Sequence, residues 1–143
     1  MKFFVDNIYN LALLIVMLAS GAALVLPGLL RRGDKVSTLQ ATQMINQGKT
    51  VLLDVRDAGA FATAHLREAR NIPLKDLGSR IAELDRDKAK SRSVIVVCDS
   101  GLKSSRATAV LRSAGFASVF SLDGGISAWQ AQGLPVARQG GAA

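Results

Sequence analysis

An uncharged N-terminal segment limits what the rest of this chain can fold into. From Ile8 to Leu30 the sequence has no charged residue and is rich in Leu, Ala, Val and Ile. A helix of this length and composition can cross the hydrocarbon core of a bilayer. We therefore expect a transmembrane helix over residues 8–30, which Pro27 and Gly28 should end. About 100 residues then remain for a single globular domain.

Two other interpretations of this segment stay open. A cleaved signal peptide would use the small residues Ala19-Ser20-Gly21-Ala22 as its cleavage site. However, only Lys2 and the amino terminus precede the apolar run as positive charges, and the run continues well past that site. The third interpretation is a helix buried in the core of the domain.

Charges beside the segment predict its orientation. Arg31-Arg32 and Lys35 follow it, partly offset by Asp34, whereas Lys2 and Asp6 precede it. The positive-inside rule then places the domain in the cytoplasm, as a single-pass protein of a membrane such as the bacterial inner membrane. A chain with one cysteine cannot form an intramolecular disulfide, which also suits a reducing compartment.

Although the net charge is +7, we expect no nucleic-acid partner. Basic residues are scattered among acids, as in residues 83–90, which we interpret as a solvated face. No basic repeat occurs, and no aromatic residues alternate with basic ones for base stacking. With a single histidine and a single cysteine, the sequence also predicts no metal site and no cofactor.

Strands and helices alternate along the remainder, which predicts an α/β domain with a parallel sheet. In the first expected helix, capped by Thr38, the side chains of Leu39, Met44 and Ile45 should face the core. Strands are expected at 36–37, 50–54, 69–72, 93–97 and 118–122. Helices are expected at 38–47, 58–64, 77–84, 104–114 and 126–132, with 85–92 as a loop.

The only cysteine, Cys98, follows the apolar run Ser93–Val97, and a helix is expected from Ser104. The thiol thus stands at the carboxyl end of a strand, where ligands bind in parallel sheets. Backbone N–H groups of the loop and the positive end of the helix favour a thiolate and would hold a small anion beside it. These features predict a nucleophile that acts on an anionic substrate.

Three motifs in order resemble those of single-domain rhodaneses. The loop Cys98-Asp99-Ser100-Gly101-Leu102-Lys103-Ser104 is similar to their active-site pattern Cys-x-x-Gly-x-Arg-Ser. The other two motifs lie upstream and downstream of it, and the resemblance covers about residues 36–138. They are Leu53-Asp54-Val55-Arg56 with Phe61, His65-Leu66, Ala69 and Asn71-Ile72-Pro73, and Gly124-Gly125-Ile126-Ser127-Ala128-Trp129 followed by Gly133-Leu134-Pro135-Val136.

The resemblance implies a rhodanese-like three-layer fold, with a central parallel sheet and helices on both faces. Because such domains are complete without an N-terminal helix, it also argues against the buried-core interpretation. The sequence departs from the family pattern at Ala60, where Glu is usual, at Ala64 and Glu68, where Gly is usual, and at Lys103, where Arg is usual. Lysine keeps the positive charge but lacks the planar guanidinium group that binds an oxyanion through two hydrogen bonds.

The resemblance also implies sulfurtransferase chemistry without a cofactor. Cys98 would take sulfane sulfur from a thiosulfate- or persulfide-type donor, hold it as a persulfide, and pass it to a thiophilic acceptor such as a thiol or an acceptor protein. Ser104 is expected to cap its helix, and His65 and Trp129 to be structural. The expected substrate-binding residues are Asp99, Ser100, Gly101, Leu102, Lys103 and Ser104, with Arg56 as a secondary and Arg106 as a further candidate.

Two alternative functions remain. Phosphatases and arsenate reductases that share this fold use the longer loop Cys-x₅-Arg, but the sixth residue after Cys98 is Ser104. A rhodanese-like binding module without strong catalysis could instead recruit a partner at the membrane. The expected organisation is a short N-terminus (1–7), a transmembrane helix (8–30), a basic linker (31–35), the domain (36–138) and a tail (139–143).

Overall fold

The computed structural model describes residues 2–30, 35–100 and 103–139. The chain divides into two compact units, residues 1–33 and residues 34–143. The basic pair Arg31-Arg32, the loop residues Gly101 and Leu102, and most of the predicted tail lie outside the described residues.

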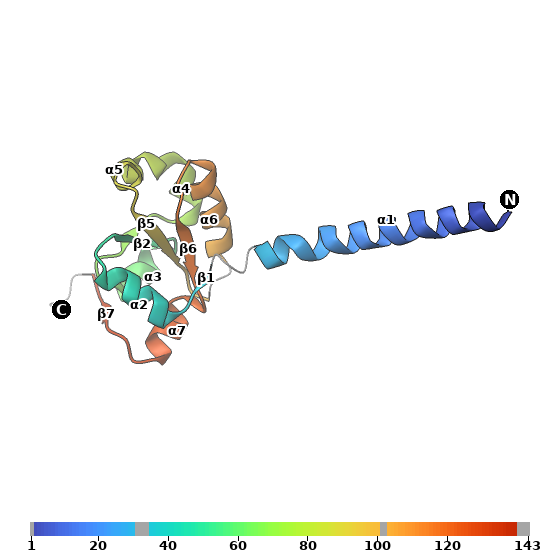
Figure 1. Ribbon diagram of the computed structural model, residues 1–143. Coiled ribbons are helices and arrows are strands. Elements are labelled where there is room, and N and C mark those ends of the chain that lie inside the picture. Colours follow the sequence, from blue (N-terminus) through green and yellow to red (C-terminus); the bar gives the residue numbers. More distant parts are fainter. Residues whose placement is uncertain (1, 31–34, 101–102, 140–143) are drawn as a thin grey trace. The chain divides into compact units, whose positions relative to one another are not determined.

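The first unit contains one helix, α1 (Lys2–Leu30), which is 29 residues long (Figure 1). The prediction that Pro27 and Gly28 end this helix is wrong, since the helix continues through both to Leu30. A proline removes one hydrogen bond from the preceding turn, and this local loss can bend a helix without stopping it.

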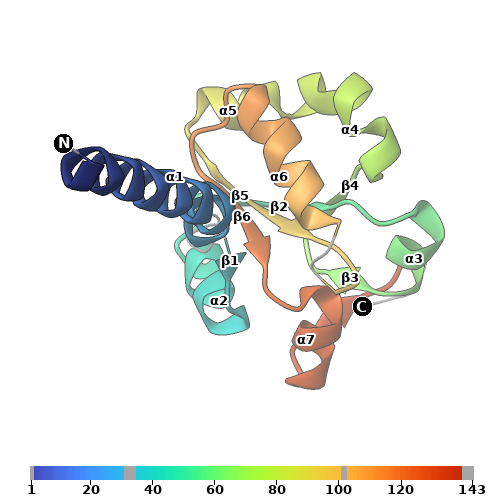
Figure 2. The ribbon, with the colours of Figure 1, turned by 90° about the vertical axis from the view of Figure 1, so that its right-hand side faces the viewer.

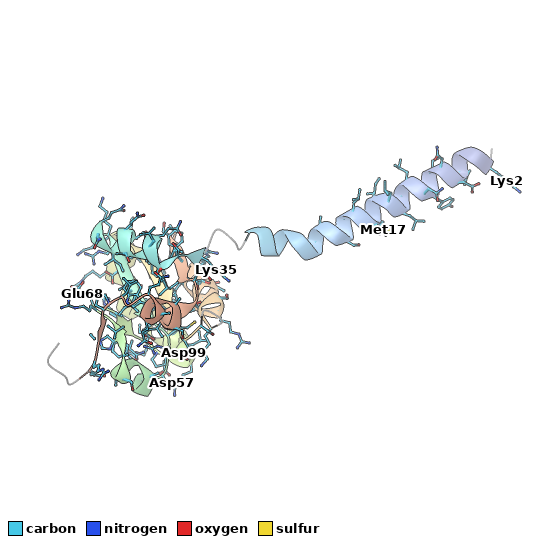
Figure 3. All side chains as sticks on the ribbon, turned by 90° about the horizontal axis from the view of Figure 1, so that it is seen from below. Lys2, Met17, Lys35, Asp57, Glu68 and Asp99 are labelled. Carbon is cyan, nitrogen blue, oxygen red and sulfur yellow. The ribbon has the colours of Figure 1, made fainter. Side chains whose placement is uncertain are left out.

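None of the apolar segment Val5–Ala23 is buried. These 19 residues have a mean hydropathy of 1.5, and Figure 3 shows side chains projecting outward along α1, among them Met17, which is 74% exposed. The helix is therefore not a core element, which rules out the third interpretation. Its length and composition suit a membrane span, and a signal sequence would look the same.

The second unit is built on a five-stranded sheet that is parallel throughout, with the strand order β1-β6-β5-β2-β4. Its centre is β5, which pairs with β2 along the full length of both strands. Both are rich in β-branched residues, as buried parallel strands usually are. The strands are β1 (Lys35–Val36), β2 (Thr50–Asp54), β4 (Arg70–Asn71), β5 (Ser93–Val97) and β6 (Val119–Leu122).

Helices cover both faces of this sheet, as predicted (Figure 2). Successive residues of β5 face opposite sides, so that Val94 and Val96 pack with α4 and α6, and Ile95 and Val97 pack with α2 and α7. The covering elements are α4 (Leu74–Arg80), the 3-10 helix η2 (Ile81–Leu84) and α6 (Ser104–Ser113) on one face, and α2 (Thr38–Asn46) and α7 (Gly125–Ala131) on the other.

A small antiparallel sheet was not predicted, whereas the short helix expected at 58–64 is present. Strand β3 (His65–Leu66) pairs with β7 (Val136–Ala137), and α3 (Ala58–Thr63) precedes β3. Two-residue strands are too short to show a period in the sequence. His65 stacks on the Phe61 ring at 3.9 Å, and Trp129 donates to the carbonyl of Pro135, so both have the structural role that was expected.

The first helix of the domain starts one residue earlier than predicted. Ser37, not Thr38, caps α2: its Oγ accepts from the Gln40 N–H, and the Gln40 Oε1 accepts from the Ser37 N–H. Thr38 and Ala41 are consequently buried, whereas Leu39 is 68% exposed, contrary to the prediction that it faces the core.

The charged run at 85–92 is not entirely a loop, although most of its side chains are exposed, as expected. It contains α5 (Asp85–Ala89), and Asp87 is only 2% exposed. The Asp87 carboxylate forms ion pairs with Arg70 at 2.7 Å and with Arg92 at 3.2 Å. A single-sequence pattern could not show this, because the partner Arg70 comes from β4.

Glu68 has a backbone φ of +64°, a conformation that costs a non-glycine residue about 1–2 kcal/mol. Replacing it by glycine should therefore raise the free energy of unfolding of the protein by about 1 kcal/mol. Urea denaturation of the full chain, followed by circular dichroism, measures this change.

Ala64 is the matched control, because it also stands where the resembled family has glycine but its φ is −162°. Ala64→Gly relieves no strain and adds chain entropy to the unfolded state, so it should destabilise the protein. Equal effects of the two substitutions would contradict this explanation.

Candidate active site

Cys98 lies where the sequence predicts, immediately after β5 at the carboxyl edge of the sheet. Strands β2 and β6 flank β5, so the cysteine stands at the middle of that edge. It is 1% exposed and belongs to the same apolar cluster as Val96 and Ala107 of α6.

The backbone that follows the thiol is held by the start of α7. The Ile126 N–H donates to the Cys98 carbonyl at 2.9 Å. The N–H and the Oγ of Ser127 both donate to the Asp99 carbonyl, at 3.2 and 2.8 Å. Two segments more than twenty residues apart in the sequence thus fix the position of the nucleophile.

Gly125 makes this contact possible. Its φ is +59°, and a Cβ at this position would stand 2.2 Å from the Cys98 carbonyl oxygen. In the sequence, Gly124-Gly125 appears only as part of a family motif, from which this role was not predicted. The signal was the glycine pair before a helix, which marks a close approach of two backbones.

Ser104 begins α6 but does not cap it, contrary to the prediction. Its hydroxyl forms a short hydrogen bond with the Ser121 hydroxyl of β6, and both residues are buried. Lys103 occupies the N-cap position without a side-chain cap bond. A buried hydroxyl needs a partner, and Ser121 provides one, so the bond fixes the start of α6 to the sheet.

Asp54 and Arg56 form a buried network at the end of the neighbouring strand. Asp54 is level with Val97, and the Arg56 guanidinium grips its carboxylate through Nε at 3.0 Å and Nη2 at 2.8 Å. Arg56 Nη2 also donates to the Ala64 carbonyl at 2.5 Å, and Asn71 Nδ2 donates to the carbonyls of Asp54 and Arg56. Asp54 and Arg56 thus form a buried ion pair that is anchored to the backbone on both sides.

The same arginine reaches the loop of the nucleophile. Arg56 Nη1 lies 3.7 Å from Oδ1 of Asp99, whose side chain is 67% exposed. Burial alone would lower the pKa of Arg56, but the hydrogen bond and charge of Asp54 and the charge of Asp99 outweigh it and raise that pKa above its ordinary value. Arg56 is therefore a cation that lies near Asp99, the residue that follows Cys98.

Three other residues predicted to bind substrate lie on the surface of the domain. Ser100, Lys103 and Arg106 are exposed, and the latter two belong to the N-cap and first turn of α6. No ion pair of Lys103 or Arg106 occurs in the part of the chain that the structure describes. Within the same part, no group of three potential metal ligands is present.

A substitution at Gly125 should disrupt the site. In Gly125→Ala the new methyl group would collide with two carbonyls of the loop, so we expect the protein to lose about 3 kcal/mol of stability or more. The reactivity of the Cys98 thiol towards a small disulfide reagent, compared with that of the unchanged protein, should change at least tenfold.

Gly133→Ala is the control, because Gly133 has a φ of +69° but nothing within 4 Å of the added methyl group. It should cost about 1–2 kcal/mol for the backbone conformation alone and leave the thiol reactivity unchanged. If both variants behave alike, the contact with the loop is not what requires glycine at position 125.

Comparisons with known proteins agree with this fold. Residues 37–132 match the family profile of the rhodanese-like domain. The chain is 36% identical over 94 residues to thiosulfate sulfurtransferase GlpE of Shewanella oneidensis, an alignment that covers 66% of this chain and 89% of that protein. It is 34% identical over 100 residues to the protein YibN of Escherichia coli, covering 69% of this chain and 68% of YibN.

Among solved structures, the crystal structure of a full-length protein from Lactobacillus plantarum is similar, with a TM-score of 0.65 and 31% identity. That similarity covers 84% of this chain and 98% of the other. The profile match and the identity to proteins named thiosulfate sulfurtransferase agree with the α/β fold and its parallel sheet. The chain belongs to the rhodanese-like domain family.

Proposed function

We propose that this protein is a membrane-anchored sulfurtransferase that carries sulfane sulfur as a persulfide on Cys98. One observation carries the proposal: the only cysteine stands at the carboxyl edge of the sheet, with its carbonyl held by α7 and a helix opening just after it. Relatives named thiosulfate sulfurtransferase support the same activity.

The reaction needs no external oxidant or reductant. The Cys98 thiolate attacks the sulfane sulfur of thiosulfate; a new S–S bond forms, the old one breaks, and sulfite leaves with its electron pair. An acceptor thiolate then attacks the outer sulfur of the persulfide. The Cys98 thiolate leaves, and the acceptor becomes the persulfide.

The proposed site stabilises anions by its backbone and by two cations. The first turn of α6 contributes N–H groups and the positive end of a helix dipole. Lys103 would pair with the donor or the persulfide, and Arg56, whose charge is already paired with Asp54, would add a weaker attraction. Ser100, Gly101, Leu102 and Ser104 would contribute backbone N–H groups, and Arg106 a more distant charge.

Asp99 would select between donors. Its exposed carboxylate is beside the nucleophile and partly neutralises Arg56. Thiosulfate carries two negative charges on its five atoms, whereas a thiol persulfide carries one at the reacting sulfur, so the Asp99 carboxylate repels thiosulfate more strongly. The proposed donor preference is therefore for persulfides over thiosulfate.

The proposed organisation keeps the boundaries predicted from the sequence, with α1 as the anchor over residues 8–30 and the rhodanese-like domain over 36–138. The exposed apolar surface of α1 supports anchoring, since such a surface is stable only in lipid or against another protein. The basic residues Arg31 and Arg32 support a cytoplasmic domain.

The second candidate is a binding module that recruits a partner at the membrane. The low exposure of Cys98, at 1%, favours it, because a deeply buried thiol reacts slowly. Lys103 in place of the usual arginine points the same way. The two candidates differ in whether Cys98 ever holds sulfur.

Intact mass spectrometry of the full chain in detergent decides between them. After incubation with thiosulfate or glutathione persulfide, we expect the mass of one added sulfur atom, which a reductant removes and which Cys98→Ser does not acquire. A folded protein that gains no sulfur from either donor would support the binding module.

The role of Asp99 predicts a shift in donor preference. Asp99→Asn removes one negative charge near the bound donor, so the rate of loading from thiosulfate should rise roughly fivefold, and loading from glutathione persulfide should rise less. The effect should shrink at high salt. Stopped reactions analysed by intact mass give both rates.

Asp123→Asn is the matched control, because Asp123 is also an exposed carboxylate after a strand of the sheet but forms no ion pair with Arg56. It should leave the ratio of the two rates unchanged. An equal rise with both donors in Asp99→Asn would contradict selection by charge.

A further inference from the structure

The chain enters the domain at the same edge of the sheet at which Cys98 lies. Lys35, the first residue of β1, is level with Ser121 of β6, which is level with Val96 of β5. Cys98 follows two residues later. With strands about 4.8 Å apart and a rise of about 3.3 Å per residue, the Cα atoms of Lys35 and Cys98 are roughly 12 Å apart.

This placement is built into the packing of the domain. The hydroxyl of Ser121, the residue opposite Lys35, is bonded to that of Ser104, the first residue of the helix after the Cys98 loop. Just past the end of β6, the Asp123 N–H donates to the Val36 carbonyl at 2.8 Å. The first strand and the loop of the nucleophile are thus tied to the same end of β6.

The connection between α1 and the domain is short. Leu30 ends α1 and Lys35 begins β1, so five peptide steps join them and reach at most about 18 Å even if fully extended. Cys98 therefore stays within roughly 30 Å of the end of α1, whatever the angle between the two units. A chain that entered at the opposite edge of the sheet would have placed the thiol farther away.

We propose that the acceptor of the Cys98 sulfur is a protein thiol held at the bilayer surface. This inference rests on the proposed function, namely an anchored domain with a Cys98 persulfide. A small soluble acceptor is equally concentrated throughout its compartment, so a short tether gains nothing for it. A partner confined to the same surface meets the nucleophile at a much higher effective concentration.

The experiment uses the full chain in phosphatidylcholine vesicles, which are neutral and add no charge attraction. Cys98 is first loaded with radiolabelled sulfur, and intact mass verifies loading. Failure at this stage, or failure of the chain to float with the vesicles, would refute the proposed function or the anchor and not the choice of acceptor.

Transfer is then measured to two lipid-anchored peptides that carry one thiol each. In one the thiol lies at the headgroups, and in the other a polyproline spacer of about twenty residues raises it by about 60 Å. We expect transfer to the first to be at least tenfold faster. The same peptide without its lipid, at equal bulk concentration, should react more slowly than the headgroup-level thiol.

A variant with thirty Gly and Ser residues inserted between Gly33 and Asp34 is the matched control. Its loading should be unchanged, but its longer reach should bring the rates for the two lipid-anchored thiols within about threefold of each other. Equal rates in the unmodified chain, no effect of the insertion, or a soluble thiol that reacts as fast as the headgroup-level thiol would each overturn the proposal.

Discussion

The parallel pairing of β5 with β2 is the interaction on which the rest of the domain depends. Its register joins Thr50 to Ser93 and Asp54 to Val97. A slip of one residue would turn every apolar side chain of the central strand to the opposite face. Because the register is fixed, the ends of the two strands coincide, and the Asp54–Arg56 pair comes to lie beside Cys98.

Polar groups inside this domain are paired across elements, and the pairs hold the site together. Ser104 joins α6 to β6, Arg56 joins β2 to the loop after β5, and Asp87 joins α5 to the start of β4. Among the described residues, no buried side-chain nitrogen or oxygen lacks a hydrogen-bond partner. Since an unpaired buried polar or charged group is costly, each pair disfavours backbone conformations that would separate its two partners.

Around Cys98, the groups that position the thiol differ from the groups proposed to take part in the chemistry. Positioning comes from carbonyls that α7 holds and from the glycine that lets α7 approach. The proposed chemistry comes from the N–H groups of α6, the cation of Arg56 and the carboxylate of Asp99, which act on charge and are tunable without moving the backbone. A family with one scaffold can therefore differ in donors through a few loop residues, and Lys103 and Asp99 are the positions where this chain would do so.

Residue patterns alone determined the class of fold, the bounds of β2 and β5, the apolar helix and the position of Cys98, because these depend on local periodicity and composition. Predictions from these patterns failed where the structure depends on a contact with a residue distant in the sequence. Ser104 is not a cap because its hydroxyl bonds to that of Ser121, and Asp87 is buried because Arg70 and Arg92 pair with it. The role of Gly125 and the closeness of Lys35 to the nucleophile likewise appeared only in the tertiary structure, since backbone approach and strand order bring together residues that no local pattern relates.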